Sequence, residues 1–534
     1  MPAYTGYIIP LPLGQGGLVG TKDQQQIAPD KLIVARNLSY EGGALRKEGG
    51  AAKYNSTVIT GAPSVLGGWD WWPSDGVQRA VVALSDGTLK KDAGTGAFAT
   101  TLKSGLTMSS VVPVFVEAGK EAAANNRKLF IFTGKNAVQT LSGDGATTAD
   151  ITTPAADWSG SNQPSFGLNH EQRLWGGGNL NDPHRIYYST TADHENMTGA
   201  GSGSISVYPG EGERLVGALS FKGLIVLWKF PRGIYIVDTT DPTISNWKVR
   251  RLSRSVGGVS PLGAAEVDND VIFVDGALNF HLLSAVQEFG DAAASNLSKK
   301  LDIYSFIQDN FNQAQAAFAR SVYYAAKREL HFAVAGLGST VNNTRFVLDF
   351  NQSEGLLRFR YSDRDTCESL WIRKDTNNVE RLTSGDNAGF VWNMDKTAKD
   401  KDGNGYSGAW QTAYVSGDWI DPILATVRKI GQFLEIVVAP TGNWNLDVDI
   451  FWDGSLVQTV TYNMGVSGSA LGSFVLGTDK LAGDQILSRK RRIVGSGRRL
   501  SIAGRNSGAG EDFSVGHAFL HCLVGDERPG RDAT

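Results

Sequence analysis

The stretch RLWGGGNLNDPHRIYYS, from Arg173 to Ser189, holds the pattern that decides the fold of this chain. An apolar strand runs into a turn rich in Gly, Asn and Asp, and a second strand that is again apolar follows the turn. The same strand-turn-strand pattern occurs at other places along the sequence. Those copies begin at Arg79, Arg127, Lys222, Asn269, Arg328 and Glu380.

The spacing of these copies predicts the architecture. Their starts lie roughly 45 to 60 residues apart, which is the period of the four-stranded unit that repeats in a β-propeller. We therefore predict an all-β chain with a propeller over residues 61–407. Seven repeat units fit between Ser64 and Asp395, so we favour seven blades and leave six or eight open.

The pattern changes after Gly408, where a single run of alternating strands replaces the repeats. Gly, Asn and Asp turns divide these strands, which is typical of a β-sandwich or jelly roll. We predict such a second domain over residues 408–534. The predicted strands are WQTAYVSGDWI, KIGQFLEIVVAP, WNLDVDIFWDG, VQTVTYNM, GSFVLG, RRLSIAGRN and HAFLHCLVG.

The N-terminal residues predict two further segments. Residues 1–30 resemble an extended arm, because Pro10, Pro12 and paired glycines oppose helix formation. Residues 31–60 contain two short strands joined by a Glu-Gly-Gly turn that begins at Glu41. A propeller closes when an N-terminal strand completes its last blade, and we predict that role for this hairpin.

Three long polar insertions interrupt the repeats, at Ser142–Gln163, Thr190–Gly212 and Leu297–Phe318. Loops of this length usually have a function or are disordered. The third insertion carries apolar residues at helical spacing, and Ser298 is a predicted N-cap. A helix packed over a blade and a helix that docks a partner both fit the pattern. The face consists of Leu301, Tyr304, Ile307, Phe311, Ala314 and Phe318.

Composition excludes several classes of function. The 51 Lys and Arg residues nearly balance the 54 Asp and Glu residues, so no global field attracts the chain to DNA, RNA or an anionic membrane. Cys367 and Cys522 are too far apart in sequence to predict a disulfide framework or a metal knuckle, which favours a reducing compartment. The N-terminus does not read as a signal peptide and no stretch reads as a spanning helix, so we expect a soluble product without a membrane anchor.

The sequence predicts no catalytic residue and no cofactor-binding residue, and we expect no enzyme and no cofactor. None of the seven histidines lies in a GxSxG or HExxH motif. His517 and His521 could share one side of a strand, but they lack further ligands at metal-binding spacing. A propeller glycosidase needs a pair of carboxylates, and none can be singled out. Exposed aromatic residues could stack on sugars or fill blade cores, namely Trp69, Trp71, Trp72 and Trp175.

One string is a weak candidate for calcium. DKDGNGYSGAWQ begins at Asp400 and places the oxygens of Asp400, Asp402 and Asn404 where an EF-hand loop has ligands. Its twelfth position is Gln411 and not the bidentate Glu that tight binding needs. A simple hairpin turn explains the same residues equally well.

A basic run is the strongest candidate for an interface. The run SRKRRIVGSGRRL, from Ser488 to Leu500, contains Arg489, Lys490, Arg491, Arg492, Arg498 and Arg499. This set could contact phosphate or an acidic partner protein. A solvated hairpin with cation–π packing is the equally weighted alternative. In a strand only some of the charges would share a face.

Two segments resemble the tail hub or nozzle proteins of short-tailed bacteriophages. The first is IAPDKLIVARNLSYEGGALRKEGGAAKY, where the family opens with a similar hairpin; its matching residues are Ala35, Asn37, Gly43, Leu45, Arg46, Lys47 and Gly49. The second is the central unit QRLWGGGNLNDPHRIYYSTTADHENM; its matching residues are Arg173, Leu174, Trp175, Pro183, Arg185, Tyr187, Tyr188 and Ser189. A looser similarity covers most of the remaining chain.

The resemblance implies a structural virion protein without enzymatic activity. Such a protein forms a homo-oligomeric ring, often a hexamer, that lines the DNA exit channel, retains the packaged DNA and lets it pass during ejection. It implies portal-adaptor proteins and tail fibre, spike or needle proteins as partners, transient non-specific contact with the DNA, and a place in the virion tail after assembly in the cytoplasm of the bacterial host. A near-neutral chain fits a channel that must release DNA, because each neutralised phosphate adds binding free energy.

Two other classes of function stay open. A receptor-binding or glycan-degrading propeller at the tail tip would place carboxylates in a pocket on the propeller axis. An intracellular scaffold of the WD40 kind is disfavoured, because no unit carries the paired GH and WD signature. The structural hypothesis predicts a ring and no turnover of polysaccharide, which distinguishes it from the receptor-binding or glycan-degrading propeller.

Overall fold

The computed structural model describes residues 4–20, 27–73, 76–92, 94, 96–119, 127–143, 145–284, 296–350, 357–375, 377–465 and 486–525. Its chain forms two compact units. The larger one, which we call the propeller unit, comprises Ala52–Val347 and Asp365–Met394. The other, which we call the sandwich unit, comprises Met1–Ala51, Leu348–Arg364 and Asp395–Thr534.

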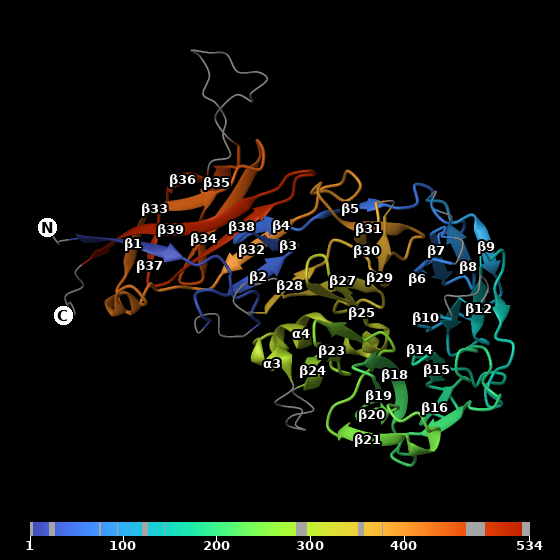
Figure 1. Cartoon of the computed structure of the whole chain (residues 1–534). Coiled ribbons are helices and arrows are strands. Elements are labelled where there is room, and N and C mark those ends of the chain that lie inside the picture. The colour runs from blue at the N-terminus through green and yellow to red at the C-terminus, as the bar shows by residue number, and fades with distance from the viewer. Residues whose placement is uncertain are drawn as a thin grey trace. The chain divides into compact units, whose positions relative to one another are not determined.

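The propeller unit contains six blades that are sheets of their own (Figure 1). Each is an antiparallel meander of three or four strands. The first three blades are β6 (Val65–Trp71), β7 (Arg79–Leu84), β8 (Leu89–Asp92) and β9 (Thr100–Lys103); β10 (Val114–Ala118), β11 (Lys128–Phe132), β12 (Gln139–Ser142) and β13 (Ala149–Asp150); and β14 (Phe166–His170), β15 (Arg173–Gly177), β16 (Arg185–Tyr188) and β17 (Gly203–Ser206).

The other three blades complete the set. They are β18 (Arg214–Phe221), β19 (Leu224–Phe230), β20 (Ile234–Asp238) and β21 (Lys248–Ser253); β22 (Ala264–Val267), β23 (Asp270–Val274) and β24 (Phe280–Leu282); and β29 (Ser369–Lys374), β30 (Glu380–Gly385), β31 (Val391–Lys396) and β5 (Gly50–Lys53). A short helix, η1 (Ile244–Asn246), precedes β21. The strand β5 comes from the N-terminal part of the chain, so the ring closes by pairing its two ends as the sequence predicted.

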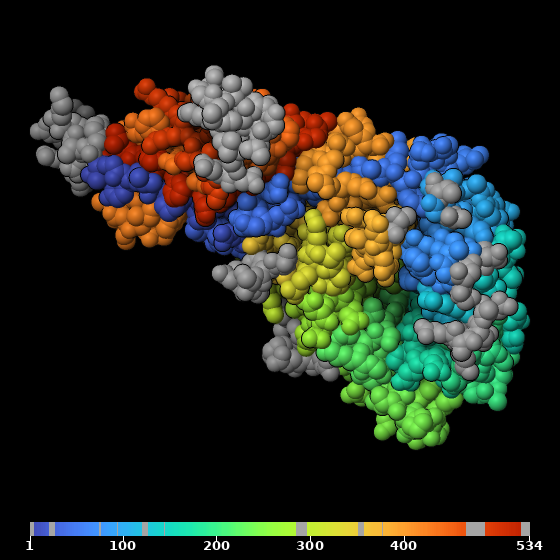
Figure 2. Space-filling model, turned by 45° about the horizontal axis from the view of Figure 1, so that its top comes forward, coloured from blue at the N-terminus to red at the C-terminus, as the bar shows by residue number. Residues whose placement is uncertain are grey.

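The inner strands follow one another around the ring. Contacts join β6 to β10, β14, β18 and β22 in turn, and β29 returns to β6. Figure 2 shows the same succession as a change of colour from blue through green to orange over the propeller unit. Between β22 and β29 lies β25 (Arg320–Tyr324), which contacts both.

The repeat unit at Arg328 explains the difference between six blades and the favoured count of seven. Its strands are β25, β26 (Glu329–Ala335) and β27 (Asn342–Asp349), and they belong to a nine-stranded sheet and not to a blade of their own. The sequence shows seven strand-turn-strand units because this one has the same local pattern. Periodicity does not reveal to which sheet a strand belongs.

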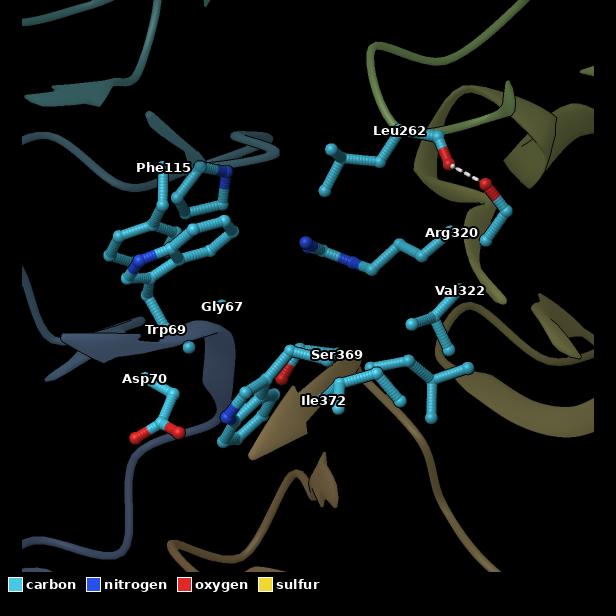
Figure 3. Close-up of a pocket in the computed structure, with 14 residues that line it drawn as sticks. Gly67, Trp69, Asp70, Phe115, Leu262, Arg320, Val322, Ser369 and Ile372 are labelled. Carbon is cyan, nitrogen blue, oxygen red and sulfur yellow. Dashed lines mark hydrogen bonds between the residues drawn. The ribbon is translucent and has the colours of Figure 1, made fainter. Parts of the chain in front are cut away.

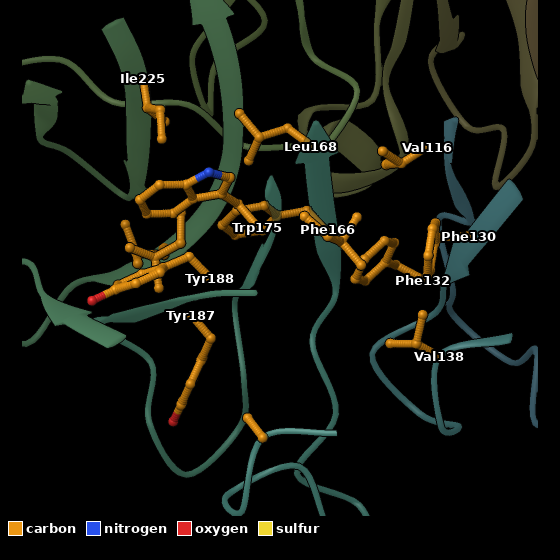
Figure 4. Close-up of a cluster of buried hydrophobic side chains, with 14 of the residues drawn as sticks. Val116, Phe130, Phe132, Val138, Phe166, Leu168, Trp175, Tyr187, Tyr188 and Ile225 are labelled. Carbon is orange, nitrogen blue, oxygen red and sulfur yellow. The ribbon is translucent and has the colours of Figure 1, made fainter. Parts of the chain in front are cut away.

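Aromatic and branched side chains fill the space between successive blades. One core cluster joins the blades that begin at β10, β14 and β18. Trp175 of β15 is completely buried in it, with Tyr188 and Ile225 on neighbouring strands around its ring (Figure 4). The ring centroids of Trp175 and Tyr188 are 4.9 Å apart, and those of Trp175 and Trp247 are 5.5 Å apart. Trp175 and Trp71 are therefore core residues and not an exposed surface for sugars.

Two of the polar insertions supply the outermost strands of blades. The segment Ser142–Gln163 contains β13, and Thr190–Gly212 contains β17. Both strands are largely exposed, so they lack the apolar alternation by which a strand is recognised in a sequence.

The third insertion is three short helices and not one. They are α3 (Leu297–Lys300), α4 (Tyr304–Asn310) and η2 (Gln313–Phe318). The N-cap of α3 is Asn296, whose side chain accepts a hydrogen bond from the Lys299 amide. The predicted cap Ser298 lies inside α3, where its hydroxyl accepts a hydrogen bond from the Phe280 amide of β24. This hydroxyl joins the insertion to a blade, so the helices pack over it.

The sandwich unit has two layers. Sheet A has the order β3 (Leu38–Glu41), β4 (Ala44–Lys47), β39 (Ser514–Gly525), β33 (Lys429–Val438), β36 (Leu487–Arg492), with β1 (Tyr4–Leu11) beside β39 and β37 (Ser496–Gly497) beside β33. The second layer has the order β28 (Arg358–Ser362), β2 (Leu32–Arg36), β32 (Gly408–Thr412), β38 (Leu500–Asn506), β34 (Asn445–Trp452), β35 (Ser455–Asn463). A short helix, η3 (Pro422–Ala425), precedes β33. Tyr462 of β35 donates a 2.8 Å hydrogen bond to the carbonyl of Leu434 in β33, which ties the layers together.

The N-terminal segments differ from their predicted roles. The hairpin β3–β4 forms with the predicted turn, and Gly42 and Gly43 adopt positive φ angles of 59° and 78° there. It pairs with β39, however, and only the following strand β5 enters a blade. Residues 4–11 form β1, which pairs with β39 along its whole length, so this part of the chain is no free arm. The predicted boundaries missed these pairings because they join distant residues. The predicted strand GSFVLG lies outside the described residues.

Candidate functional site

The residues that carry the resemblance of the central unit form one tightly bonded group in the blade β14–β17. Arg173 donates to the carbonyls of Ser189 and Gly201, both at 2.6 Å, and its guanidinium lies 5.7 Å from the ring centroid of Tyr188. The Ser189 hydroxyl accepts a hydrogen bond from the Leu174 amide. These residues hold the blade together, and the group offers no free reactive side chain of its own.

Asp157 accepts hydrogen bonds from Arg185 and Tyr187, which lie in the second strand of this motif. Its Oδ2 accepts hydrogen bonds from Arg185 at 3.0 Å and from the Tyr187 hydroxyl at 2.9 Å. Burial, followed by this hydrogen bond, raises the pKa of Tyr187. Asp157 lies in the insertion Ser142–Gln163, so this insertion contributes hydrogen bonds to β16 of the next blade.

The residues of the N-terminal motif also stabilise the fold. Asn37 has a positive φ of 54°, and its side chain donates to Asp363 at 3.0 Å and to the carbonyl of Ser407 at 2.7 Å. Lys47 is completely buried; its ammonium donates to the carbonyl of Gly508 at 2.9 Å and lies 4.4 Å from the ring centroid of Tyr406. Burial lowers the pKa of Lys47 to about 8. Arg46 pairs with Asp512 at 2.8 Å.

The basic run is divided into two parts. Arg489, Lys490, Arg491 and Arg492 lie on β36, the edge strand of sheet A, opposite residues 433–436 of β33. Arg498 and Arg499 follow β37, which pairs with Lys429 and Ile430 at the start of β33. Residues 431 and 432 of β33 separate the positions that pair with β36 from those that pair with β37. The six cations are therefore divided between β36 and the segment that follows β37.

Lys490 and its neighbours form a polar group on sheet A. Its ammonium lies 3.4 Å from Nδ1 of His521, whose Nε2 lies 2.8 Å from the Glu435 carboxylate. Glu435 also accepts a hydrogen bond from the Ser488 hydroxyl, and these two bonds lower the pKa of Glu435. The Glu435 carboxylate thus partly neutralises the positive charge of β36. His521 lies within hydrogen-bond distance of both Lys490 and Glu435, while His517 lies opposite Val437 on the same pair of strands.

Arg491 and Arg492 are the exposed cations of this strand that have no ion-pair partner among the described residues. Both side chains are solvent-exposed, and among the described residues neither forms an ion pair. Arg489 instead donates to the carbonyl of Gly465. Lysine and arginine on an exposed edge strand oppose unwanted pairing with other strands. The same two charges are also free to bind an acidic surface.

The weak calcium candidate forms a tight turn. The carboxylate of Asp400 accepts a hydrogen bond from the Gly403 amide at 2.9 Å, and the amide of Asn404 donates to the carbonyl of Lys401 at 3.0 Å. Asp402 and Gly403 have positive φ angles of 52° and 83°. Over the described part of the chain, no group of three or more His, Cys, Asp or Glu side chains is placed to hold a metal ion.

A cavity that the sequence did not predict lies among the inner strands of the propeller unit. It has a volume of about 340 Å³. Its walls include Trp69 of β6, Phe115 of β10, Leu262 before β22, and Trp371 of β29. Arg320 of β25 also lines it, and Figure 3 shows this side chain extending toward Phe115 and Trp69. A single arginine at the start of an apolar strand carries no motif, which is why sequence reasoning missed it.

Cys367 and Cys522 are both buried free thiols, and burial raises the pKa of Cys522 to about 11. In the described segments, no helix is long and apolar enough to cross a membrane.

Comparison with known proteins identifies no family for this chain. No family model matches the chain, and no curated protein matches it in sequence. Among solved structures, the WD40 repeats of RRP9 are similar at a TM-score of 0.38 and 8% identity, over 66% of this chain and 99% of that one. BBS1N, solved in complex with ARL6DN, reaches 0.39 and 13%, over 64% and 97%. The computationally designed Ika8 protein reaches 0.38 and 12%, over 64% and 99%.

Proposed function

We propose that this chain is a structural protein of a short bacteriophage tail, which forms a ring around the path of the DNA. The observation that carries the proposal is the resemblance of the segments around Ala35–Gly49 and Arg173–Ser189 to tail hub or nozzle proteins. The matching side chains hold the hairpin β3–β4 and the blade β14–β17 in shape. Proteins that share a fold but differ at their surfaces are expected to share the residues that determine the fold.

The charge distribution supports the same function. A ring that lets DNA pass must not neutralise many phosphates, because each neutralised phosphate releases counterions and strengthens binding. The chain has a formal net charge of −3, and its basic run is split and partly paired with Glu435. Portal-adaptor proteins and tail fibre, spike or needle proteins are the proposed partners, and the virion tail is the proposed location.

A binding experiment tests the channel part of this proposal. The purified full chain is titrated with a DNA duplex at about 50 mM and about 200 mM salt. We expect weak binding at the lower salt concentration and a small dependence on salt, since few phosphates are contacted. Tight binding with a steep loss between the two concentrations would indicate a DNA-binding protein and would contradict the proposal.

The alternative function is tested with the same preparation. A glycan-degrading propeller would release reducing ends from capsular or cell-wall polysaccharide of the bacterial host. The proposed structural role requires no turnover. Turnover that survives repeated purification and vanishes on mutation of a carboxylate in the propeller unit would replace the proposed function.

A further inference from the structure

The cavity among the inner strands holds a buried cation that forms no hydrogen bond and no ion pair within the described residues. Arg320 is only 2% exposed, and its Nε atom is fully buried without a hydrogen-bond acceptor. Within the described residues its guanidinium makes no hydrogen bond and no ion pair. A buried guanidinium usually has a carboxylate or several carbonyls around it, because an uncompensated charge is costly to bury. Arg320 is therefore an exception that needs an explanation.

Two neighbouring side chains add unpaired donors. The indole Nε1 atoms of Trp69 and Trp371 are also buried without a hydrogen bond. The hydroxyl of Ser321 donates to the carbonyl of Leu262 at 2.7 Å, as the dashed line in Figure 3 shows. Asp70, the carboxylate of this cavity, already accepts from the Lys374 amide at 2.8 Å and from the side chains of Trp72 and Gln78.

Two glycines of β6 shape the walls. A Cβ atom on Gly68 would lie 2.6 Å from the indole of Trp371, and one on Gly67 would lie 2.9 Å from the ring of Phe115. These aromatic rings can approach β6 only because residues 67 and 68 lack side chains. The cavity is thus bounded by aromatic faces, and its charged lining residues are Arg320 and Asp70.

A second cavity adjoins the first. It has a volume of about 390 Å³ and shares Asp70 and Ile372 with it. Arg127 and Lys374 line this second cavity, and Arg127 is paired with Glu117. Both cavities are formed by residues of the propeller unit alone.

We propose that the inner cavity of the propeller binds a small organic carboxylate, with Arg320 pairing with the carboxylate and the aromatic walls packing around an apolar body. A carboxylate has acceptors only, which matches the unpaired donors of Arg320, Trp69 and Trp371. Arginine presents two parallel N–H groups to a carboxylate, so one residue is enough for a bidentate pair. The volume falls in the range of small-molecule sites. This inference does not depend on the proposed function.

The pKa of Arg320 supports the electrostatic part of the argument. Burial lowers the pKa of Arg320 to about 10, so the side chain is still charged at pH 7. Glu368 raises that pKa only in part, and no ion pair joins these two residues within the described chain. A bound anion would supply the missing countercharge.

The test uses benzoate as the probe, and benzyl alcohol as a neutral probe of similar shape. Titration calorimetry or ligand-detected NMR with the full chain should show saturable binding of benzoate and at least about tenfold weaker binding of benzyl alcohol. Removal of one charged hydrogen-bonding group costs about that much. Absence of benzoate binding up to about 10 mM, or equal binding of both probes, overturns the proposal.

Substitutions locate the site. Arg320→Met should weaken benzoate binding at least about tenfold, whereas Arg328→Met should leave it unchanged. Arg328 is a matched control, because it lies in the same repeat unit but pairs with Asp268 at the surface. Benzoate binding that persists in Arg320→Met contradicts the assignment. If Arg320→Met does not fold, Arg320→Lys keeps the charge but loses the bidentate geometry, and unaltered affinity for benzoate in that variant also contradicts it.

Discussion

At the scale of single residues, Trp175 shows how the recognition motif works. Its side chain is completely buried between three blades and packs on Tyr188 and Trp247. A motif that is short in sequence thus fills a large volume in the core.

We expect Trp175→Ala to lower the free energy of unfolding by about 3–5 kcal/mol, because it removes a large buried ring and leaves a cavity. Denaturant unfolding of the full chain measures this loss. Trp419→Ala is the control, since Trp419 is 42% exposed and its removal should change stability by no more than about 0.5 kcal/mol. Equal effects of the two substitutions would show that Trp175 is not a core residue.

Lys47 predicts a dependence of stability on pH. Its pKa is lowered from 10.5 to about 8 in the folded chain, so between these values the unfolded chain binds more protons at this site. Stability contributed by this site therefore rises as the pH increases from 8 to 10.5, by roughly 2–3 kcal/mol. Tyrosines and Cys522 also change protonation at alkaline pH and affect stability. The wild-type chain is therefore compared with Lys47→Met, which lacks only the Lys47 amine. The difference in unfolding free energy, wild type minus variant, should increase with pH; a difference that stays constant contradicts the lowered pKa.

At the scale of elements, β36 carries the charges that are free for a partner. We expect the double variant Arg491→Glu and Arg492→Glu to fold normally, because both side chains are exposed on an edge strand. Its incorporation into tail particles should fall strongly, since an acidic partner surface would now be repelled. Quantitative blotting of purified particles measures incorporation. Lys248→Glu with Arg250→Glu, on the exposed strand β21, is the matched control; normal incorporation of the β36 variant refutes an interface at this strand.

β1 makes a second prediction at this scale. Deletion of residues 1–12 would remove all its pairs with β39 and leave a backbone edge of sheet A uncovered. We expect a lower melting temperature and self-association through that edge. Light scattering and thermal unfolding of the truncated chain measure both. A truncated chain that stays as stable and as dispersed as the full one would show that β1 is dispensable.

The sequence predicted those elements whose pattern is local. The apolar inner strands of the blades, the Gly42–Gly43 turn and the strands of residues 408–463 and 500–525 all carry periodicity or turn residues. The outer strands β13 and β17 were interpreted as loops, because exposed strands do not alternate. The pairing of β1 and of β4 with β39 was missed, since nothing local in these strands indicates a partner more than 450 residues away. Arg320 was missed for the same reason.

At the scale of the whole molecule, the chain is a six-bladed propeller unit and a two-layered sandwich unit. The N-terminal segment contributes to both units. Residues up to Ala51 belong to the sandwich unit, and the strand β5 completes the last blade of the propeller. In the proposed function this scaffold acts as part of a wall around DNA. Binding of small carboxylates by the propeller cavity would be a separate property of one subunit.

The most direct test of the proposed function is single-particle electron microscopy of the purified full chain, alone and with portal-adaptor proteins. We predict closed rings, of six copies if the chain follows the resemblance, with a central channel wide enough for a DNA duplex. Monomers that stay dispersed under both conditions, or an assembly without an open channel, would contradict the account.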